Sequence, residues 1–236
     1  MIFLAGVLVC LILLNTLYKG INTIDRLDVV ESERDQWQRP SDVIAALKLK
    51  EGNVVADVGS GAGYFALKLS RTVGRSGKVL AVDLRKLSLL FLWIRAFSRS
   101  EHNVRILVGD PDDPRLPAGI VDAVLIANTY HEFAHPERML DYTLRSLRWG
   151  GRLVVLDRSL AAPNSGEEEE AHHHELPPEL VDSQLRQKGL EILQRQDRFI
   201  VRASEEQWWL IVACKAKPAH SSSGVGDSGS EGFRKR

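Results

Sequence analysis

The sequence predicts an α/β fold in which a doubly wound, mostly parallel sheet of seven strands carries helices on both faces. Three observations lead to this prediction. Short runs rich in Val, Leu and Ile alternate along the chain with amphipathic stretches of helical length. Polar and apolar residues hardly alternate within these runs, which is typical of strands buried on both faces. A glycine-rich turn joins the first run to the helix that follows it.

The composition is that of one globular domain with appendages. The chain has 236 residues, of which 44% are hydrophobic, and this is enough to build a core. Lys and Arg together number 31, as do Asp and Glu, so the net charge is zero. Proteins that bind nucleic acid usually carry a basic excess, so we expect no nucleic acid among the partners. The two cysteines, Cys10 and Cys214, give no disulfide framework.

An apolar segment opens the chain. Residues 1–18 carry no charged side chain, and as a helix they would measure about 27 Å, close to the thickness of a bilayer's hydrocarbon core. A cleaved signal peptide would have a basic start and a small-residue cleavage site, and neither is present. We predict a membrane-anchor helix over residues 1–18. Lys19 and Arg26 follow it, so the positive-inside bias makes the protein membrane-associated with its folded domain in the cytoplasm. Asn15 and Thr16 interrupt the segment, which leaves open a position in the membrane interface.

The remaining elements follow in order. Residues 19–39 have mixed charge and are predicted to form a polar linker, and Pro40 opens the first helix of a folded domain over residues 40–217. The strands of the parallel sheet are predicted at residues 54–58, 78–82, 105–108, 123–127 and 152–156. The helices between them are predicted at residues 64–73, 84–98 and 136–148.

The end of the domain has a different pattern. A helix at residues 178–188 precedes two strand candidates, 190–200 and 207–215, with no helix between them. This order predicts an antiparallel pair of strands. Residues 218–236 are low in sequence complexity and are predicted to be disordered.

The helix predicted at residues 84–98 is apolar on two faces. The face that we expect to pack on the sheet comprises Leu87, Leu90, Phe91, Ile94 and Phe97. The opposite face, which also carries basic side chains, comprises Leu89, Leu92 and Trp93. Apolar residues mixed with basic ones are typical of contact with lipid headgroups, and cover by the N-terminal segment or by a partner chain is an equally good interpretation.

The densest functional pattern is the turn after the first strand. Asp57 is followed by Gly59, Gly61 and Gly63. Glycine permits positive φ and lets the backbone approach a ligand closely. Asp83 ends the second strand, 20 residues after Gly63, and a carboxylate there can accept both hydroxyls of a ribose. We therefore expect a ligand that contains a nucleoside.

Two kinds of nucleoside ligand fit this turn. The stretch from Gly61 to Ala66 also matches the dinucleotide pattern G-x-G-x-x-A. Asp57 discriminates between them, because a carboxylate at the end of the strand would repel a pyrophosphate but suits a cationic ammonium group. S-adenosylmethionine carries such an ammonium, and a nicotinamide dinucleotide does not. The pattern therefore favours S-adenosylmethionine as the cofactor.

The same residues resemble a known family. Asp57-x-Gly59-x-Gly61-x-Gly63 resembles motif I of class I S-adenosylmethionine-dependent methyltransferases, which have a Rossmann-like fold, and Asp83 resembles the acidic residue after their second strand. Residues 121–128 resemble their fourth strand. Residues 147–153 resemble their L-K-P-G-G turn, with Trp149 in place of the usual Pro. The likeness spans roughly residues 37–215 and is closest to the small-molecule branch that includes ubiquinone/menaquinone C-methyltransferases.

The resemblance implies a set of cofactor-binding residues. Asp110, which follows Gly109 at the end of the third strand, resembles the acidic residue that meets the adenine amino group. The whole set comprises Asp57, Gly59, Gly61, Gly63, Asp83, Leu84, Asp110 and Asn128. It also implies that the loop from Asn128 to His131 lies over the transferred methyl group.

Three side chains are candidates for catalysis. His131 and Tyr130 are in position to touch the substrate, and His131 is the first candidate for a general base if the acceptor must lose a proton. His174 lies after the fifth strand, where a histidine of related methyltransferases often faces the active site. His131 and His135 also spell the zinc motif H-E-x-x-H. Pro136 disfavours helical geometry just before it, so we expect no metal.

These observations predict an enzyme that transfers a methyl group by in-line displacement to a small acceptor. The apolar N-terminal segment favours a lipid or quinone-like molecule soluble in the membrane. Two alternatives stay open. One is a catalytically silent cofactor-binding scaffold at a membrane, and the other is a nicotinamide-dependent oxidoreductase.

Overall fold

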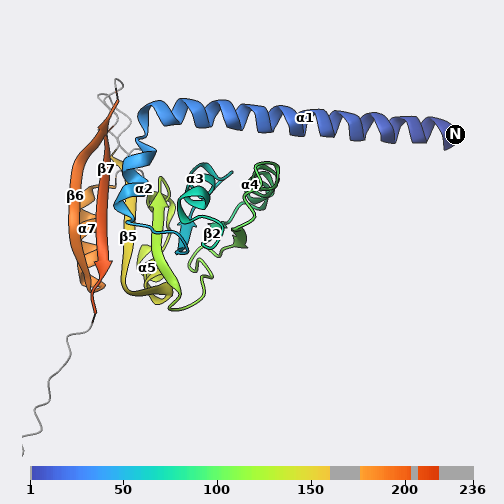
Figure 1. Cartoon of the computed structure of the whole chain (residues 1–236). Helices are drawn as coiled ribbons and strands as arrows, with labels where there is room; N and C mark the ends of the chain where they lie inside the picture. The colour runs from blue at the N-terminus through green and yellow to red at the C-terminus, as the bar shows by residue number, and fades with distance from the viewer. Residues whose placement is uncertain (1, 160–175, 203–206, 218–236) are drawn as a thin grey trace, which may run out of the picture.

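The computed structural model describes residues 2–159, 176–202 and 207–217 of the chain, with side chains in the N-terminal helix described from Leu11 on except at positions 13 and 17. A single sheet of seven strands, in the order β3-β2-β1-β4-β5-β7-β6, forms the centre of the molecule (Figure 1). The predicted fold class, including the antiparallel pair at the end of the sheet, is confirmed. The predicted tail over residues 218–236 lies outside the described residues, as does His174.

Five strands of this sheet run parallel. They are β1 (Val54–Val58), β2 (Lys78–Asp83), β3 (Val104–Val108), β4 (Val121–Ala127) and β5 (Leu147–Ser159). β7 (Gln207–Lys215) runs antiparallel between β5 and β6 (Leu190–Val201). The strand order reverses between β1 and β4, and in doubly wound sheets this switch point is where ligands bind.

Two apolar layers cover the sheet. Residues of α2 (Pro40–Ala46), α3 (Tyr64–Val73) and α4 (Lys86–Ser98) form the core on one face. The 3-10 helix η1 (Tyr130–Glu132), α5 (Pro136–Ser146) and α7 (Pro178–Gln187) supply the core on the other. Each of the two layers therefore contains helices from different parts of the chain.

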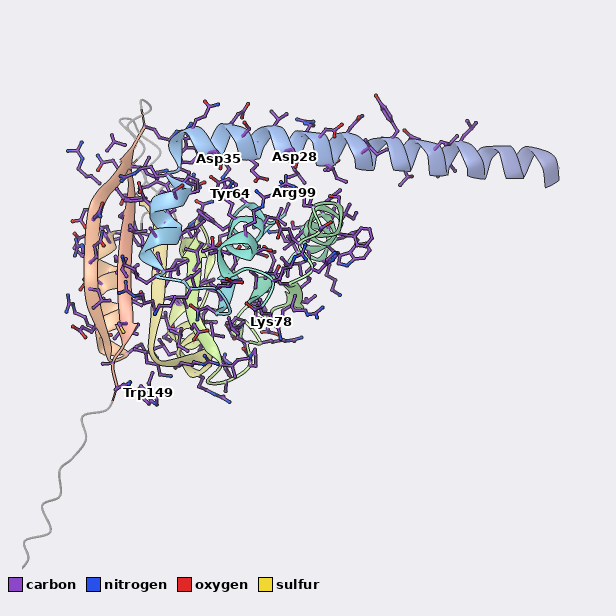
Figure 2. All side chains as sticks on the ribbon, in the orientation of Figure 1. Asp28, Asp35, Tyr64, Lys78, Arg99 and Trp149 are labelled. Atoms are coloured by element: carbon purple, nitrogen blue, oxygen red, sulfur yellow. The ribbon has the colours of Figure 1, made fainter. Side chains whose placement is uncertain are left out.

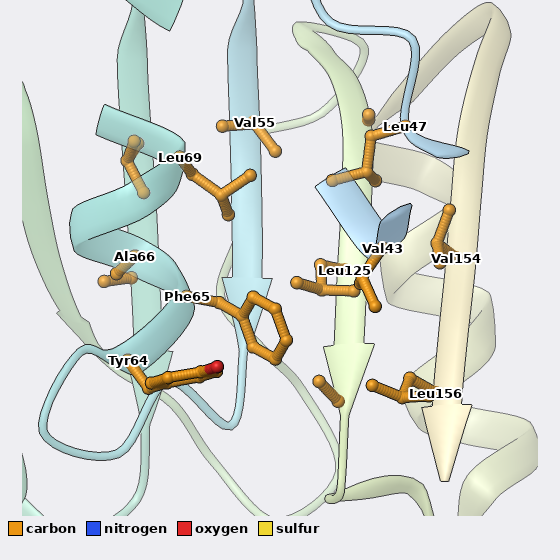
Figure 3. Packing of buried hydrophobic residues seen from close by; sticks show 14 of the residues in the cluster. Val43, Leu47, Val55, Tyr64, Phe65, Ala66, Leu69, Leu125, Val154 and Leu156 are labelled. Atoms are coloured by element: carbon orange, nitrogen blue, oxygen red, sulfur yellow. The ribbon is translucent and has the colours of Figure 1, made fainter. Parts of the chain in front are cut away.

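Figure 3 shows how α2 and α3 pack on the strands. Phe65 and Leu69 of α3 lie against β1, and Val43 of α2 lies near Leu125 of β4. These side chains are 3% exposed or less. Burial of one such side chain stabilises a fold by about 1.5–3 kcal/mol. The glycine-rich turn that links β1 to α3 is therefore held between two well-packed elements.

The orientation of α4 differs from the prediction, although Trp93, predicted on the face away from the sheet, is 56% exposed. Leu89 and Leu92 pack in the core, whereas Leu87 is 65% exposed and Phe97 is 67% exposed. The two faces have similar apolarity, so periodicity alone did not separate them. Arg95 decides the outcome, because its guanidinium has acidic partners only on the buried side.

The chain before Pro40 also differs from the prediction. Residues 19–39 were expected to form a linker, but α1 (Ile2–Trp37) is one helix that includes nearly all of them. It crosses over the domain, and its N-terminal half projects past α4 (Figure 1). Three acidic residues of α1, namely Asp28, Glu31 and Asp35, lie on the side that faces the domain.

Basic side chains of α3 and α4 hold this acidic face. Arg95 pairs with Asp28 at 3.0 Å and also with Glu31. Arg99 reaches Asp28 at 2.8 Å, and Lys68 of α3 reaches Asp35 at 2.9 Å. Figure 2 shows Asp28 and Asp35 on the underside of α1 above Arg99 and Tyr64. The segment is a helix because its charges, spaced three and four residues apart, meet this basic surface.

Most side chains of the predicted anchor over residues 1–18 are not among those that the structure describes. In the part of the chain whose side chains the structure does describe, no helical stretch combines the length and apolarity needed to cross a bilayer. The anchor stays a prediction.

Removing the buried Arg95 guanidinium should destabilise the protein. Arg95 is 2% exposed, and its loss takes from Glu31 of α1, whose side chain is 12% exposed, one of the cations that offset its buried charge. We expect Arg95→Met to lower the free energy of unfolding by about 3 kcal/mol in urea denaturation. Arg71→Met is the matched control, because Arg71 pairs with Glu101 at 2.8 Å but is 62% exposed, and it should cost less than about 1 kcal/mol. Equal effects of the two substitutions would contradict this account.

Candidate functional site

A cavity of about 400 Å³ lies at the carboxyl ends of β1, β2 and β4. Its walls are the glycine-rich turn, the ends of β2 and β3, and the loop after β4. α1 forms its roof, and the α1 residues that line it are Leu27, Val30, Glu31 and Arg34. The site is therefore placed at the switch point of the sheet, where a ligand is expected, and is closed from above by a helix that the sequence did not predict.

The backbone of the glycine-rich turn is tightly held. Gly59, Gly61 and Gly63 all have positive φ, at 81°, 52° and 95°. A Cβ on Gly59 would overlap the side chain of Thr129, and one on Gly63 would overlap Leu92 of α4. Glycine is required at both positions because the turn touches the loop after β4 on one side and α4 on the other. Gly59 and Gly61 line the cavity, whereas Gly63 packs behind it.

Asp57 is a buried carboxylate at the end of β1. It is 2% exposed, and burial raises its pKa from 3.8 to about 7. A backbone hydrogen bond from Ala66 and the charge of Arg34 act in the opposite direction without offsetting burial. Among the described residues, none offers a hydrogen bond to its Oδ2 atom. Asp57 lines the cavity, and a buried carboxylate with an oxygen that lacks a partner is suited to a cationic ligand group.

Asp83 fixes the floor of the site. Its Oδ2 accepts a hydrogen bond from the Gly61 backbone N–H at 2.8 Å, and its Oδ1 accepts one from the Arg85 N–H at 2.8 Å. The side chain is thus held between the glycine-rich turn and the start of α4. Each carboxylate oxygen keeps a second lone pair, so the role predicted for Asp83 toward a ribose is compatible with these contacts.

The other predicted cofactor residues also line the cavity. Leu84 and Asp110 follow β2 and β3, and Asn128 follows β4. Asn128 adopts a positive φ of 55°, and its backbone N–H donates to Leu156 of β5 at 2.7 Å. This unusual conformation directs the chain into the loop after β4. The set proposed from the sequence, apart from Gly63, therefore converges on one cavity.

Two residues of the site were missed in the sequence. Arg34 of α1 lies with its guanidinium carbon 3.8 Å from the centre of the Tyr64 ring, and Tyr64 donates a hydrogen bond to Asp35 at 2.8 Å. Both Arg34 and Tyr64 line the cavity. The spacing of Leu27, Glu31 and Arg34 by four and three residues is a helical pattern that could have revealed Arg34.

The predicted catalytic residues separate into three cases. His131 lies in η1, and its Nδ1 is 2.8 Å from Asp157 Oδ1 of β5. The hydrogen bond with Asp157 raises the pKa of His131 above 6.5, although burial acts to lower it. Tyr130 is 2% exposed and donates to Gln184 of α7 at 2.8 Å, so its hydroxyl faces the core rather than the cavity. His174 is outside the described residues.

The H-E-x-x-H stretch does not form one helix. His131 belongs to η1, while His135 precedes α5, which starts at Pro136. His135 is an exposed side chain near Glu137, with a separation of 3.8 Å. Within the described ranges, no three His, Cys, Asp or Glu side chains are grouped to hold a metal ion. The zinc motif therefore lacks the helical register that zinc proteases require.

Comparisons with known proteins agree with this geometry. Residues 56–155 match the family model described as a methyltransferase domain. The ubiquinone/menaquinone biosynthesis C-methyltransferase UbiE of Azotobacter vinelandii is 35% identical over 112 residues, which are 47% of this chain and 44% of that protein. The chain thus matches less than half the length of this curated relative.

Solved structures share the fold. A S-adenosylmethionine-dependent methyltransferase from Aquifex aeolicus has a TM-score of 0.66 at 24% identity, covering 82% of this chain and 98% of that one. Phosphoethanolamine N-methyltransferase 2 of Haemonchus contortus, solved in complex with S-adenosyl-L-methionine, has a TM-score of 0.65 at 13% identity, covering 77% of this chain and 53% of that one. Residues 56–155 thus match a methyltransferase domain model and are similar to the ubiquinone/menaquinone C-methyltransferases, and the chain shares the fold of these solved S-adenosylmethionine-dependent methyltransferases.

Proposed function

We propose that this protein binds S-adenosylmethionine and transfers its methyl group to a small, lipid or quinone-like acceptor at a membrane. The observation that supports the choice of cofactor concerns Asp57. This residue lines the cavity, and its buried Oδ2 atom has no hydrogen-bond partner among the described residues. An ammonium group can pair with this oxygen, whereas a pyrophosphate would meet a repulsive charge. This argues against the nicotinamide-dependent alternative.

The remaining lining residues match the other parts of the cofactor. Arg34 supplies a positive charge from the roof and suits a carboxylate, while Asp83 suits the ribose hydroxyls. Leu84 and Asp110 stand at the position expected for adenine. The cavity volume of about 400 Å³ falls in the range of about 300–1,000 Å³ that is common for small-molecule sites.

The protein has few chemical tasks in this reaction. The bound sulfonium supplies an electrophilic methyl group, so what the chain must do is hold the acceptor in line and exclude water. Phe133, Ala134 and Met139 form an apolar part of the wall beyond the loop after β4. This wall suits an apolar acceptor. Such an acceptor fits the similarity to ubiquinone/menaquinone C-methyltransferases and the predicted anchor at residues 1–18.

We also propose His131 as the general base for acceptors that must lose a proton. Asp157 is fully buried and accepts a hydrogen bond from the backbone N–H of His131. In the tautomer of His131 that leaves Nε2 unprotonated, Asp157 also accepts one from the Nδ1–H. This arrangement fixes the ring and stabilises its protonated form. His131 does not line the cavity, whereas its neighbours Thr129 and Glu132 do, so the acceptor must reach past these residues to meet the ring.

Transfer of labelled methyl from S-adenosylmethionine into a membrane lipid extract tests the function as a whole. We expect the full chain to label an apolar fraction, and label in the organic phase should depend on Asp57. Binding of S-adenosylhomocysteine with no label in any fraction would favour the silent scaffold instead.

Cofactor affinity should depend on pH through Asp57. The ammonium pairs with the ionised carboxylate, whose pKa in the ligand-free protein is about 7. Affinity should therefore fall about tenfold from pH 8 to pH 6. Asp57→Asn should bind about 10–100-fold more weakly at pH 8 and lose this dependence. Calorimetry with S-adenosylhomocysteine measures both effects, and Asp141→Asn, an exposed carboxylate on α5, is the control.

The same substitution should make the ligand-free protein more stable at alkaline pH. Burial raises the pKa of Asp57 in the folded protein from its usual 3.8 to about 7, so the free energy of unfolding of the wild type falls as the pH rises from about 4 to above 7. We expect Asp57→Asn to raise the free energy of unfolding in urea by about 1–3 kcal/mol at pH 8. The difference in this free energy between variant and wild type should narrow toward pH 4. A destabilised variant at pH 8 would show that Asp57 has a structural partner instead.

Methyl transfer should rise with pH as His131 loses its proton. The inflection is expected above pH 6.5, because Asp157 raises the pKa of His131. We expect His131→Ala to lower kcat about 100-fold or more and Asp157→Asn to lower kcat and shift the inflection to lower pH. His135→Ala removes an exposed histidine of the same loop and should change neither. An unchanged pH profile in His131→Ala would exclude the base.

A further inference from the structure

The outer face of α4 is an exposed apolar surface. It comprises Leu87, Leu90, Trp93 and Phe97, which are 65%, 50%, 56% and 67% exposed. The Trp93 and Phe97 rings stack with their centres 5.9 Å apart. A contiguous exposed patch of large apolar side chains marks an interaction site more often than it marks an ordinary surface.

The buried sides of α4 are already occupied. Leu89 and Leu92 pack in the core, and Arg95 and Arg99 hold α1. The outer face is directed away from both of these contacts. It therefore does not receive α1. The basic side of the helix, for which the sequence left cover by the N-terminal segment open, is the side that α1 meets through Arg95 and Arg99.

We propose that this outer face of α4 docks on the surface of an anionic lipid bilayer, the one that α1 enters. This inference rests on the proposed membrane anchor but not on the methyltransferase reaction. α4 lies at the edge of the domain past which the N-terminal half of α1 projects (Figure 1). A bilayer entered by that half of α1 would face this edge of the domain.

The length of α1 sets the distance between α4 and the bilayer. Asp28 is the α1 residue paired with α4, and Tyr18 lies about 15 Å farther along the helix axis at about 1.5 Å per residue. Side chains of α4 extend about 5–6 Å from its axis, and the headgroup layer of one leaflet is about 5–7 Å thick. If Tyr18 marks the edge of the hydrocarbon core, the α4 side chains and the headgroup layer together span about 10–13 Å of this distance. A modest tilt of α1, such as membrane helices commonly adopt, brings the apolar side chains of α4 to the headgroup layer.

One basic side chain of α4, Lys86, is exposed next to the apolar face and suits an anionic headgroup. Residues 84–100 contain four basic side chains and no acidic one. Two of these, Arg95 and Arg99, are taken up by α1, and Arg85 pairs with Glu132 at 3.0 Å. Lys86 remains exposed beside Leu87 at the start of the helix. Aromatic and aliphatic side chains next to a basic group are the composition of helices that lie at membrane surfaces.

Tryptophan quenching by brominated lipids tests this docking. The full chain is reconstituted with phosphatidylcholine–phosphatidylglycerol vesicles that carry bromine on the acyl chains, and flotation first measures whether it binds. We expect the emission of the wild type to be quenched and Trp93→Phe to lose most of that quenching. Trp149→Phe is the matched control, because Trp149 is 57% exposed but lies at the far end of the domain (Figure 2). It should leave the quenching in place.

A second pair of variants tests the patch without removing the probe. Leu90→Glu should reduce the quenching of Trp93 at least twofold, because it places an acidic group against anionic lipid. Leu193→Glu, on an exposed position of β6, should not change it.

The outcomes separate the docking from the anchor. Vesicles that float with the protein while Trp93→Phe quenches like the wild type would overturn the docking and leave the anchor standing. Failure to float would overturn both, and neither result bears on methyl transfer in solution. A stable dimer in detergent that Leu90→Glu dissociates would assign the patch to a second copy of the chain and overturn the proposal.

Discussion

The buried guanidinium of Arg95 is the contact on which the geometry of the site depends. It donates to the carbonyl oxygen of Ala62 in the glycine-rich turn at 2.6 Å and pairs with Asp28 and Glu31 of α1. One side chain of α4 thus joins the turn that forms the site to the helix that covers it. Burial would raise the pKa of Glu31, but Arg99, Arg95 and Lys68 together lower it below 4.5. The roof therefore stays ionised and attached at neutral pH, because three cations share the acidic face of α1.

This arrangement places opposite charges at defined points of one cavity. Asp57 holds a buried carboxylate whose ionisation is opposed by burial, while Arg34 brings a positive charge from α1 into the same space. A zwitterionic amino-acid group satisfies both at once, whereas a single ion satisfies only one. Burying Asp57 without a full set of hydrogen-bond partners lowers the stability of the fold. Such a loss of stability is expected for a group whose role is to bind a ligand. It is offset by the packing of β1 and α3 on either side of the turn.

The sequence predicted the parts of the fold that depend on local patterns. The strands and helices from Val54 onward follow from apolar runs and from the glycine-rich turn, whose residue types are dictated by backbone geometry. Gly59 and Gly63 had to be glycine because of Thr129 and Leu92, two contacts that no local pattern shows. The roof was missed for a different reason. Residues 19–39 resemble a linker because the partners of their acidic face lie in α3 and α4, 29 to 71 residues away in the chain.

The orientation of α4 has the same origin and connects the site to the membrane proposal. Two apolar faces on one helix are indistinguishable by periodicity, and the ion pairs of Arg95 and Arg99 with α1 select the one that packs inward. The same pairs that attach the roof therefore also leave Leu87, Leu90, Trp93 and Phe97 outside. Since α1 carries the apolar N-terminal segment, attaching it to α4 fixes the angle at which that segment leaves the domain. A cavity roofed by such a helix is held at a constant distance from any bilayer that the segment enters.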